Sequence, residues 1–461
     1  MNKNMDLAII GAGPAGLACA LAARRCGLDV ALLDEQAQPG GQLFRNIQSP
    51  LAQALHDARE RDTGLDLVHR FDECGALHLP GSTVWGMDNH NVFYTRDNEA
   101  QKITASYIVV APGGMERPVP FPGWTLPGVL TAGGADIVLK SSGTFSENRE
   151  PVVLAGNGPL LLSVANHLLD AGIPIAAWLD TGNWCERLLS AAFIPASVLD
   201  LPYLAKGLKL FWRLVRASVR IVRSVTDIRA EGGDHLEKVR YTAGGTEHEL
   251  ATSTLIRHEG IIPRTHIANS LGARLVWDKT QRYWHPECTE NGQSSLEHIF
   301  FVGDGAYVHG GDASILKGEL AGIEVARLLK VLGSEEAAFR SARARKKLRI
   351  IKMARAFLQH TFAPRADLFA VPDDTMICRC ECVRAADIRK AVKEGFLDVN
   401  EVKRVTRCGM GQCQGRMCGQ ALAELVAQAQ SLSPEAVGTL HVRQPFRPVT
   451  LEHYCSLHAP K

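Results

Sequence analysis

Cysteine is the residue type in this chain whose spacing most clearly points to chemistry. Six of the twelve cysteines lie between residues 378 and 418. A Cys-x-Cys pair is followed after 32 residues by a second pair with four residues between its members. Two such pairs supply four thiolates that can converge on two irons, as an iron–sulfur cluster requires. The predicted metal ligands are Cys378, Cys380, Cys413 and Cys418.

Zinc is the alternative metal for four cysteines, although zinc sites more often pair cysteines two residues apart. Cys382 and Cys408 are expected to be surplus thiols, because including Cys382 would place three ligands within five residues. Gly409, Gly411 and Gly415 surround the second pair and would let the backbone bend sharply enough to aim amide groups at sulfur.

A glycine-rich turn near the N-terminus indicates a second kind of chemistry, the binding of a dinucleotide. The apolar run 7–10 ends in a turn that contains Gly11, Gly13 and Gly16, and a helical pattern follows it. The first glycine makes the tight turn, the second lets a pyrophosphate approach, and the third lets the helix pack on the strand. Asp34 ends the next apolar strand, where an acid can accept hydrogen bonds from a ribose. Strand, helix and acid together predict a nucleotide site.

A second strand–turn–helix unit begins at residue 151 and contains Gly156 and Gly158. It fits a nucleotide less well, because Leu161 stands where the third glycine is expected and the nearest acid, Asp180, lies about one place beyond the strand end. No arginine follows closely to take a 2′-phosphate. Nicotinamide dinucleotide, another adenine nucleotide and a purely structural unit all remain open here.

The order of the remaining glycine segments resembles that of the two-dinucleotide-domain flavoprotein disulfide reductase superfamily over about residues 5–330. The segments are Gly40-Gly-Gln42, Val109 to Gly113, the second glycine turn, and a late Gly303-Asp304. The resemblance implies FAD on the first domain, although Pro112 departs from the usual crossover and the redox Cys-x-x-Cys is missing. The residues that it implies along FAD are Gly11, Gly13, Gly16, Asp34, Gly41, Gln42, Gly113 and Asp304.

The cysteine-rich segment resembles the bacterioferritin-associated-ferredoxin-like [2Fe-2S] domain. Taken with the flavin motifs, it makes nearly the whole chain resemble the alpha subunits of heteromeric bacterial amine dehydrogenases: opine oxidases, D-hydroxyproline and dye-linked L-proline dehydrogenases, and hydrogen cyanide synthase. The stretches that carry this resemblance are 40–45, 121–129, 155–161, 378–381 and 409–418.

That resemblance implies an electron-transferring subunit whose amine substrate, an opine or D-hydroxyproline for example, is oxidised to the imine on a flavin of a separate beta subunit. A small ferredoxin-like subunit is a further expected partner. No acid–base pair or nucleophile accompanies the flavin motifs in this chain, so no catalytic residue is assigned. The alternatives are a hydrogen cyanide synthase subunit that acts on glycine, a self-contained NAD(P)H-dependent flavin reductase, and a structural scaffold.

Composition favours an ordinary globular α/β protein, since 46% of the 461 residues are hydrophobic and 22% are charged. The net charge of +2 gives no drive towards nucleic acid. We expect no stretch close to the roughly 20 apolar residues of a membrane span. The expected location is cytoplasmic, at most peripheral to the inner membrane. Residues 334–360 form a basic helical pattern, either a solvated connector or a docking surface for an acidic partner.

The expected fold class is α/β, with two Rossmann-like dinucleotide-binding domains of the disulfide-reductase type and a small α-rich C-terminal [2Fe-2S] domain. The expected boundaries are 1–118 with 248–332 for FAD, 119–247 for the second dinucleotide-like domain, 333–372 for a basic helical linker, 373–430 for the cluster and 431–461 for a tail.

Overall fold

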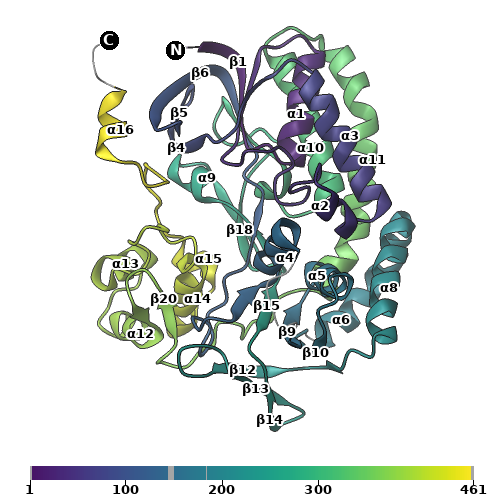
Figure 1. Cartoon of the computed structure of the whole chain (residues 1–461). Coiled ribbons are helices and arrows are strands. Elements are labelled where there is room, and N and C mark those ends of the chain that lie inside the picture. The colour runs from purple at the N-terminus through teal and green to yellow at the C-terminus, as the bar shows by residue number, and fades with distance from the viewer. Residues whose placement is uncertain (1–2, 144–149, 183, 458–461) are drawn as a thin grey trace.

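The computed structural model describes residues 3–143, 150–182 and 184–457. The first unit of the fold is built on a mainly parallel sheet (Figure 1). The strands run in the order β3-β2-β1-β6-β5-β4, and β19 pairs with β6. Strands β1, β2, β3 and β19 are parallel to one another and to the end of β6, whereas β4 and β5 form an antiparallel edge. The bounds are β1 Lys3–Ile10, β2 Val30–Leu33, β3 Leu77–Leu79, β4 Thr83–Met87, β5 Asn91–Arg96, β6 Glu99–Val110 and β19 Ile299–Phe301.

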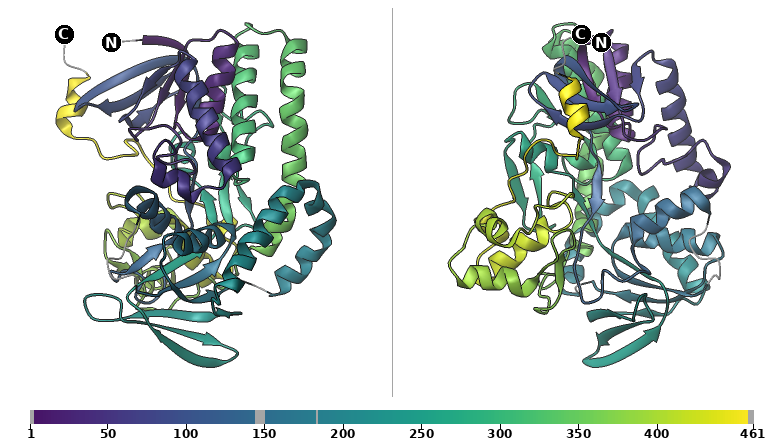
Figure 2. Two further views of the ribbon diagram at one scale, coloured as in Figure 1. Left: turned by 45° about the vertical axis from the view of Figure 1, so that its right-hand side comes forward. Right: turned by 60° about the vertical axis from the view of Figure 1, so that its left-hand side comes forward.

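Helices pack in a layer beside this sheet (Figure 2). Helix α1 lies against α10 at a very short separation, because Gly318 of α10 leaves room for the backbone of α1: a Cβ there would lie 2.0 Å from the Ala15 carbonyl oxygen. Helix α11 packs on the outer side of α10. The bounds are α1 Pro14–Arg25, α2 Pro50–Leu55, α3 Ala58–Glu73, α10 Gly311–Leu328 and α11 Ser334–Thr361.

The second unit contains a five-stranded parallel sheet in the order β11-β10-β9-β15-β8. The central strands β9 and β15 are largely buried, as expected of a parallel sheet covered on both faces. An antiparallel three-stranded sheet, β12-β13-β14, projects from it. The bounds are β8 Val129–Thr131, α4 Ala132–Ser142, β9 Val152–Asn157, α5 Pro159–Asp170, β10 Ile175–Asp180, β11 Ile221–Val222, β12 Thr226–Glu231, β13 Lys238–Ala243, β14 Thr246–Ala251 and β15 Leu255–Glu259.

The second sheet extends beyond the boundary that the sequence suggested at residue 247. Strand β15 pairs with β9 and β8 in the middle of that sheet, so the return to the first unit follows residue 259. The apolar part of β15 is too short to be assigned to either sheet from its pattern alone. The returning chain contains β16 Ile261–Pro263, which pairs with β7 Gly114–Glu116, then α9 His266–Ser270, β17 Leu275–Asp278, β18 Tyr283–Pro286 and η3 Gly303–Gly305.

The C-terminal region is a small helical domain with its own hydrophobic core. Beyond it the chain runs back to the edge of the first sheet (Figure 1), where the Gln444 amide donates to the Met87 carbonyl and accepts from the Met87 N–H, both at 2.7 Å. The bounds are β20 Met376–Cys378, β21 Val383–Arg384, α12 Ala385–Lys393, α13 Val399–Thr406, α14 Gly419–Gln430, α15 Pro434–Val437 and α16 Leu451–Ser456.

The helical segment 187–216 contradicts the expectation that no stretch of the chain comes close to the length of a membrane span. Among the described residues, this helical segment is long and apolar enough to cross a membrane by length and composition, and only 11% of its most apolar window is buried. It is divided into short elements instead of forming one straight helix, with Pro195 and Pro202 at two of the junctions. The elements are α6 Trp184–Ser190, η1 Ala191–Phe193, α7 Ile194–Ser197, η2 Val198–Asp200 and α8 Leu201–Arg216.

Candidate functional site

The first glycine turn joins β1 to α1, and two of its glycines are required by packing alone. Gly11 has φ +107°, and a Cβ there would lie 2.3 Å from the carbonyl oxygen of Ala111. A Cβ on Gly16 would lie 1.9 Å from the carbonyl oxygen of Gly11. These positions bring strand and helix into direct backbone contact, as a dinucleotide turn requires.

Gly13 and Gly41 together leave bare backbone at the N-terminus of α1. A Cβ on Gly13 would meet only the Gly41 Cα, at 3.8 Å, whereas a Cβ on Gly41 would lie 2.7 Å from the Gly13 Cα. No side chain caps α1, so its first N–H groups can receive an anion. Gln42 follows with an exposed side chain. A hollow of about 220 Å³ lies on the other side of Gly41, lined by Gln36, Gln38 and Arg45. The bare backbone at the N-terminus of α1 fits a pyrophosphate.

Asp34, at the end of β2, braces this turn. Its Oδ2 accepts the Ala12 N–H at 2.5 Å and its Oδ1 accepts the Gln36 N–H at 2.7 Å. Burial raises the pKa of Asp34 in spite of these hydrogen bonds. Each carboxylate oxygen keeps a second lone pair, so the side chain can hold the turn and also accept a ribose hydroxyl.

Asp304, in the short helix η3, is held in a turn that faces the same edge of the sheet. Its Oδ1 accepts the N–H groups of His309 and Gly310 at 2.9 Å each. Gly113 has φ +69° and open space where a Cβ would lie. Pro112 packs on the turn, and Gly305 makes room for it, since a Cβ on Gly305 would be 2.6 Å from the proline ring.

Lys317 is a half-buried cation that the sequence analysis missed. Its ammonium group donates to the carbonyl oxygens of Gly303 and Tyr307, at 3.3 Å and 2.7 Å. Burial lowers the pKa of Lys317 to about 8, while the nearby Asp304 carboxylate opposes that shift. Lys317 therefore fixes both ends of the turn that carries Asp304. It lies on α10, one place before a buried glycine, and no sequence motif marks it.

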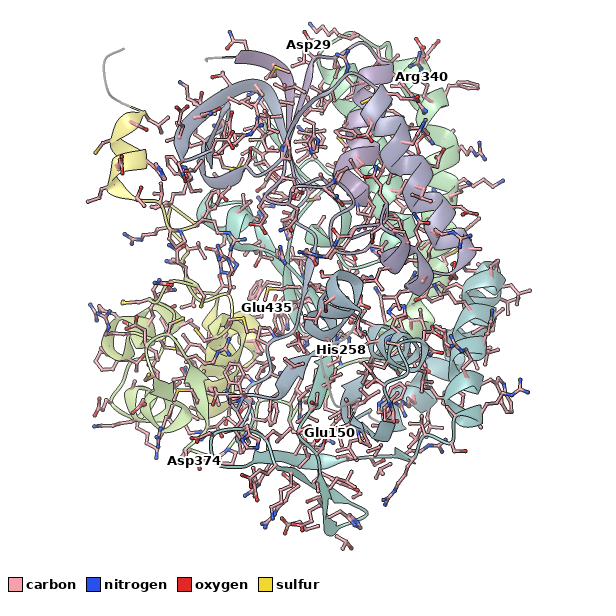
Figure 3. The ribbon with its side chains drawn as sticks, viewed as in Figure 1. Asp29, Glu150, His258, Arg340, Asp374 and Glu435 are labelled. Atoms are coloured by element: carbon pink, nitrogen blue, oxygen red, sulfur yellow. The ribbon has the colours of Figure 1, made fainter. Side chains whose placement is uncertain are left out.

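The second glycine turn is built in the same way but is more crowded. Gly156 has φ +132°, and a Cβ there would lie 1.8 Å from the His258 carbonyl oxygen. A Cβ on Gly158 would lie 3.1 Å from the His258 ring. That ring is buried in the middle of the second unit (Figure 3), with Nδ1 2.7 Å from Glu116 Oε1.

Asp180, the acid at the end of β10, is already paired. Arg187 donates from Nη1 and Nη2 to its two oxygens, at 2.7 Å each, and the Gly182 N–H donates at 2.9 Å. An arginine therefore does approach this turn, from α6, contrary to the expectation from the sequence. A nucleotide ribose would have to compete with this bidentate ion pair.

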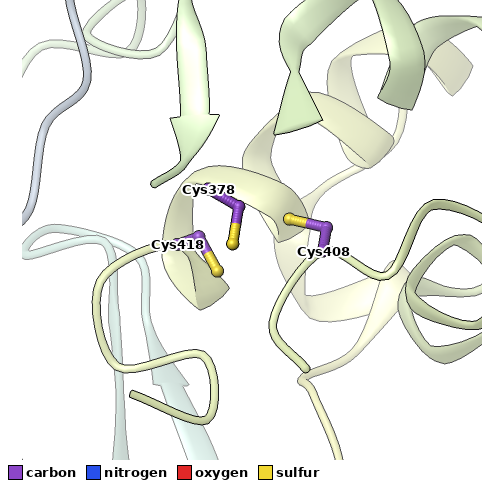
Figure 4. Close-up of side chains that lie close together, drawn as sticks. All are labelled: Cys378, Cys408 and Cys418. Carbon is purple, nitrogen blue, oxygen red and sulfur yellow. The ribbon is translucent and has the colours of Figure 1, made fainter. Parts of the chain in front are cut away.

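The cysteine region brings three thiols into one buried group. The sulfurs of Cys378, Cys408 and Cys418 lie within 4.8 Å of one another, and Figure 4 shows them pointing together. Hydrogen bonds from the Cys408 and Cys418 thiols hold the pKa of Cys378 well below its usual range, although burial opposes the shift. Among the described residues, Cys378 and Cys418 are thus joined by a cysteine that the sequence analysis had set aside.

Cys380 and Cys413 form a neighbouring pair. Both the backbone and the thiol of Cys413 interact with the Cys380 sulfur. Gly411 permits this approach, because a Cβ there would lie 2.1 Å from the Cys380 Cβ. Cys382 is exposed, in a left-handed turn with φ +53°. The region therefore offers a buried group of three thiols and a neighbouring pair, Cys380 and Cys413, and Cys382 belongs to neither.

Several contacts fasten the cysteine domain to the rest of the chain. The Trp124 indole donates to the Met376 carbonyl at 2.7 Å, and the Arg379 guanidinium lies 4.9 Å from the centre of the Trp124 ring. Arg282 forms an ion pair with the buried Glu424, with Nη2 and Oε2 2.5 Å apart. A further contact joins His266 Nε2 and the Gln414 carbonyl oxygen, 3.3 Å apart. Through it, the loop that carries Cys413 touches the segment returning to the first sheet.

Comparison with known proteins agrees with this two-part architecture. The family model described as pyridine nucleotide-disulphide oxidoreductase matches residues 5–327, and the sarcosine oxidase A3 domain model matches residues 374–456. The crystal structure of L-proline dehydrogenase from P. horikoshii covers 98% of this chain and 79% of its own, with 20% identity and a TM-score of 0.72. A thioredoxin reductase from Lactococcus lactis covers 71% of this chain and all of its own, with 15% identity and a TM-score of 0.52.

Similarity to curated proteins extends over the whole length. An opine oxidase subunit from Agrobacterium tumefaciens (strain Ach5) is 36% identical, covering 98% of this chain and 92% of that protein. Hydrogen cyanide synthase subunit HcnB from Pseudomonas aeruginosa is 30% identical and covers 98% and 99%. The alpha subunit of sarcosine oxidase from Rhizobium meliloti (strain 1021) is 27% identical, and only 42% of that longer protein is covered.

The chain belongs to the pyridine nucleotide-disulphide oxidoreductase family and carries a C-terminal sarcosine oxidase A3 domain with a cysteine group. Within that class it is an alpha-type subunit of the heteromeric flavoenzymes represented by opine oxidase and hydrogen cyanide synthase. The family assignment made from the sequence is thereby confirmed.

Proposed function

We propose that this chain is the electron-transferring FAD and [2Fe-2S] subunit of a dehydrogenase complex that oxidises a secondary amine or amino acid to the imine. The substrate class is that of opines or D-hydroxyproline, and a partner flavoprotein subunit performs the oxidation. The observation that carries the proposal is the buried thiol group in a domain fastened to a dinucleotide-binding fold. Similarity to opine oxidase subunits over nearly the full length supports the substrate class.

The residues at the first glycine turn would hold FAD. The bare backbone at Gly13 and Gly41 fits the pyrophosphate, Asp34 fits a ribose, and Asp304 fits the ribityl chain or a phosphate. The thiols of the C-terminal domain would hold the cluster, with Cys378, Cys380, Cys413 and Cys418 as the proposed ligands and Cys408 beside them. When bound, FAD supplies two-electron chemistry and a [2Fe-2S] centre supplies single-electron transfer.

Charged side chains and backbone N–H groups of this chain would bind and orient these cofactors. The N-terminus of α1 would stabilise negative charge on a bound phosphate, and Lys317 keeps the Asp304 turn in place. Backbone N–H groups of Glu381 and Gly409 donate to the Cys378 sulfur. Such donors stabilise negative charge on a thiolate cluster and help to set its potential.

A self-contained NAD(P)H-dependent reductase is the second candidate, because the glycine turn at Gly156 and Gly158 retains the dinucleotide geometry. The Asp180–Arg187 ion pair argues against it, since the acid that would bind a nicotinamide nucleotide ribose is already engaged. For that turn, the remaining proposals are that it binds another adenine nucleotide or that it is purely structural.

The test is to purify the full-length chain anaerobically and to measure its visible spectrum, flavin, iron and acid-labile sulfide. The proposal expects FAD, two irons and two sulfides per chain, and no reduction by an amine until the partner flavoprotein subunit is added. Bleaching of the flavin by NADH alone would favour the reductase. Stoichiometric zinc without sulfide, or robust amine-dependent dye reduction by the chain alone, would refute the proposal. A cytoplasmic setting and a ferredoxin-like third subunit belong to the same proposal.

A further inference from the structure

The helical segment α6–α8 concentrates exposed apolar side chains on one part of the molecule. Ten of the 22 large apolar side chains that are exposed among the described residues lie between positions 188 and 215. Leu188 is 72% exposed and Trp212 is 62% exposed. Scattered exposed apolar residues are normal on a soluble protein, but a gathering of this density marks an interaction surface.

On α8 these side chains form one stripe. Leu201, Leu208 and Val215 follow one another at intervals of seven residues, and Phe211 and Trp212 fall on the same side at helical spacing. All five are exposed. The stripe is therefore a continuous outward face that no described part of the chain covers.

The opposite side of α8 fixes the helix to the body of the protein. Leu214 is fully buried there. Lys206 forms ion pairs with Asp57 and Glu60 of the α3 region, at 2.7 Å and 2.5 Å, and Arg213 pairs with an acid at the end of α5. Ion pairs with the globular body would be broken if the segment crossed a bilayer, so it can lie on a membrane but not span it.

Exposed basic side chains flank the stripe on α8, and the segment itself contains few acids. Lys209 and Arg216 are exposed beside it on α8, and Asp200 is the single acid between residues 187 and 216. Helix α11 packs against α6 and α7 and lies along the same edge of the molecule (Figures 1 and 2). Its exposed surface includes Lys346 and Lys347, and no acid occurs between 337 and 361.

We propose that the outward face of α6–α8 docks on the surface of a bilayer that contains anionic phospholipid, with the α8 stripe immersed at the headgroup level. A basic amphipathic helix with Trp, Phe and Leu on its apolar face has the composition of an interfacial helix. The Lys and Arg side chains of α8 and α11 complement lipid phosphates. A second copy of the chain does not fit, because two such basic rims would repel each other. This inference stands independently of the proposed redox function.

The test uses the full-length chain and sedimentation with vesicles of phosphatidylcholine alone or with added phosphatidylglycerol. We expect binding to the mixed vesicles, much weaker binding to phosphatidylcholine, and release by salt. The double variant Leu208→Glu/Trp212→Glu should bind at least about tenfold more weakly, because two interfacial anchors become charges. Leu451→Glu, at a position 82% exposed on α16, is the matched control and should bind like the unchanged chain.

A second measurement identifies the immersed residue. Vesicles with brominated acyl chains should quench part of the tryptophan fluorescence, and Trp212→Phe should remove that part. Equal thermal unfolding of all variants verifies that folding is intact. Absence of binding to the mixed vesicles, or equal binding by the double variant, would overturn the proposal. The proposal would also be overturned if the double variant failed to assemble with a partner subunit and the intact complex did not bind vesicles. The face would then be a subunit interface.

Discussion

Replacing Gly13 by valine separates flavin binding from folding. Gly13 has φ −76° and ψ −179°, a conformation open to any residue. The nearest atom to an added Cβ is 3.8 Å away, so the folded chain accommodates the side chain. Loss of glycine at this N-cap position should lower the free energy of unfolding by no more than about 1 kcal/mol.

The effect on FAD should be far larger. The valine methyl groups would stand between the pyrophosphate and the N-terminal N–H groups of α1. Losing one or two hydrogen bonds to a charged group costs about 2–5 kcal/mol, which corresponds to a dissociation constant at least about 30-fold higher. Fluorescence titration of the apoprotein with FAD measures this constant, and denaturant unfolding of the same sample measures stability.

Gly16→Val is the matched control with the opposite outcome. Its Cβ would lie 1.9 Å from the Gly11 carbonyl oxygen, so the strand–helix contact must open and the chain should lose about 3 kcal/mol of stability or fail to fold. If Gly13→Val binds FAD with unchanged affinity, or loses flavin only together with its fold, the assignment of the turn to the pyrophosphate is refuted.

Three further predictions address other parts of the molecule. Cys413→Ser should lose the cluster, whereas Cys408→Ser should keep two irons with an altered EPR signal, because its thiol touches two proposed ligands; loss of iron from Cys408→Ser would instead make it a ligand. Lys317→Met leaves two carbonyl groups without their donor, so FAD affinity should fall by about 1–3 kcal/mol, and unchanged flavin titration would contradict this. Burial opposes ionisation of Asp136, but the hydrogen bond with His167 and nearby charges outweigh burial and lower the pKa of Asp136 to about 2. Its contribution of about 2 kcal/mol is therefore present above pH 4 and lost as the pH falls towards 2, so Asp136→Asn should match the unchanged chain at pH 2 and unfold more easily at pH 6.

Local sequence patterns predicted the first unit well because the residues of its glycine turn are close together in the sequence. The turn at Gly11 to Gly16 combines strand, glycine spacing and helix within ten positions, and the structure has the predicted β1–α1 arrangement. The family followed from the same stretches and from the cysteine motifs, and the comparisons confirm it.

What escaped the sequence analysis depends on side chains that arrive from a distance. Arg187 reaches Asp180 because α6 folds back over the end of the sheet. No known sequence spacing predicts an ion pair between these two residues, which are seven positions apart. Cys408 joins the thiol group because Arg407 ends α13 in the left-handed conformation, φ +66°, and turns the following residues inward. Spacing alone gives the number of thiols but not which ones meet.

The ion pair between Arg282 and Glu424 joins the cysteine domain to the flavin fold, and the direction of its effect on stability with pH can be tested. Glu424 is 1% exposed, and burial raises its pKa even though Arg282 opposes the shift. A raised folded pKa means that the carboxyl group contributes stability at low pH and loses it as the pH rises through that pKa. The pair therefore sets orientation more than it stabilises the fold.

Glu424→Gln keeps a polar group of the same shape but removes the buried charge, and Glu424→Ala leaves Arg282 without its partner. We expect the glutamine variant to unfold within about 1 kcal/mol of the unchanged chain at pH 7, and the alanine variant to lose about 3 kcal/mol. Relative to the glutamine variant, the unchanged chain should lose stability as the pH rises above 4.5, the usual value for a glutamate. Denaturant unfolding across pH 4–8 measures both effects. A glutamine variant as unstable as the alanine variant would show that the charge itself holds the two domains together, contrary to this reasoning.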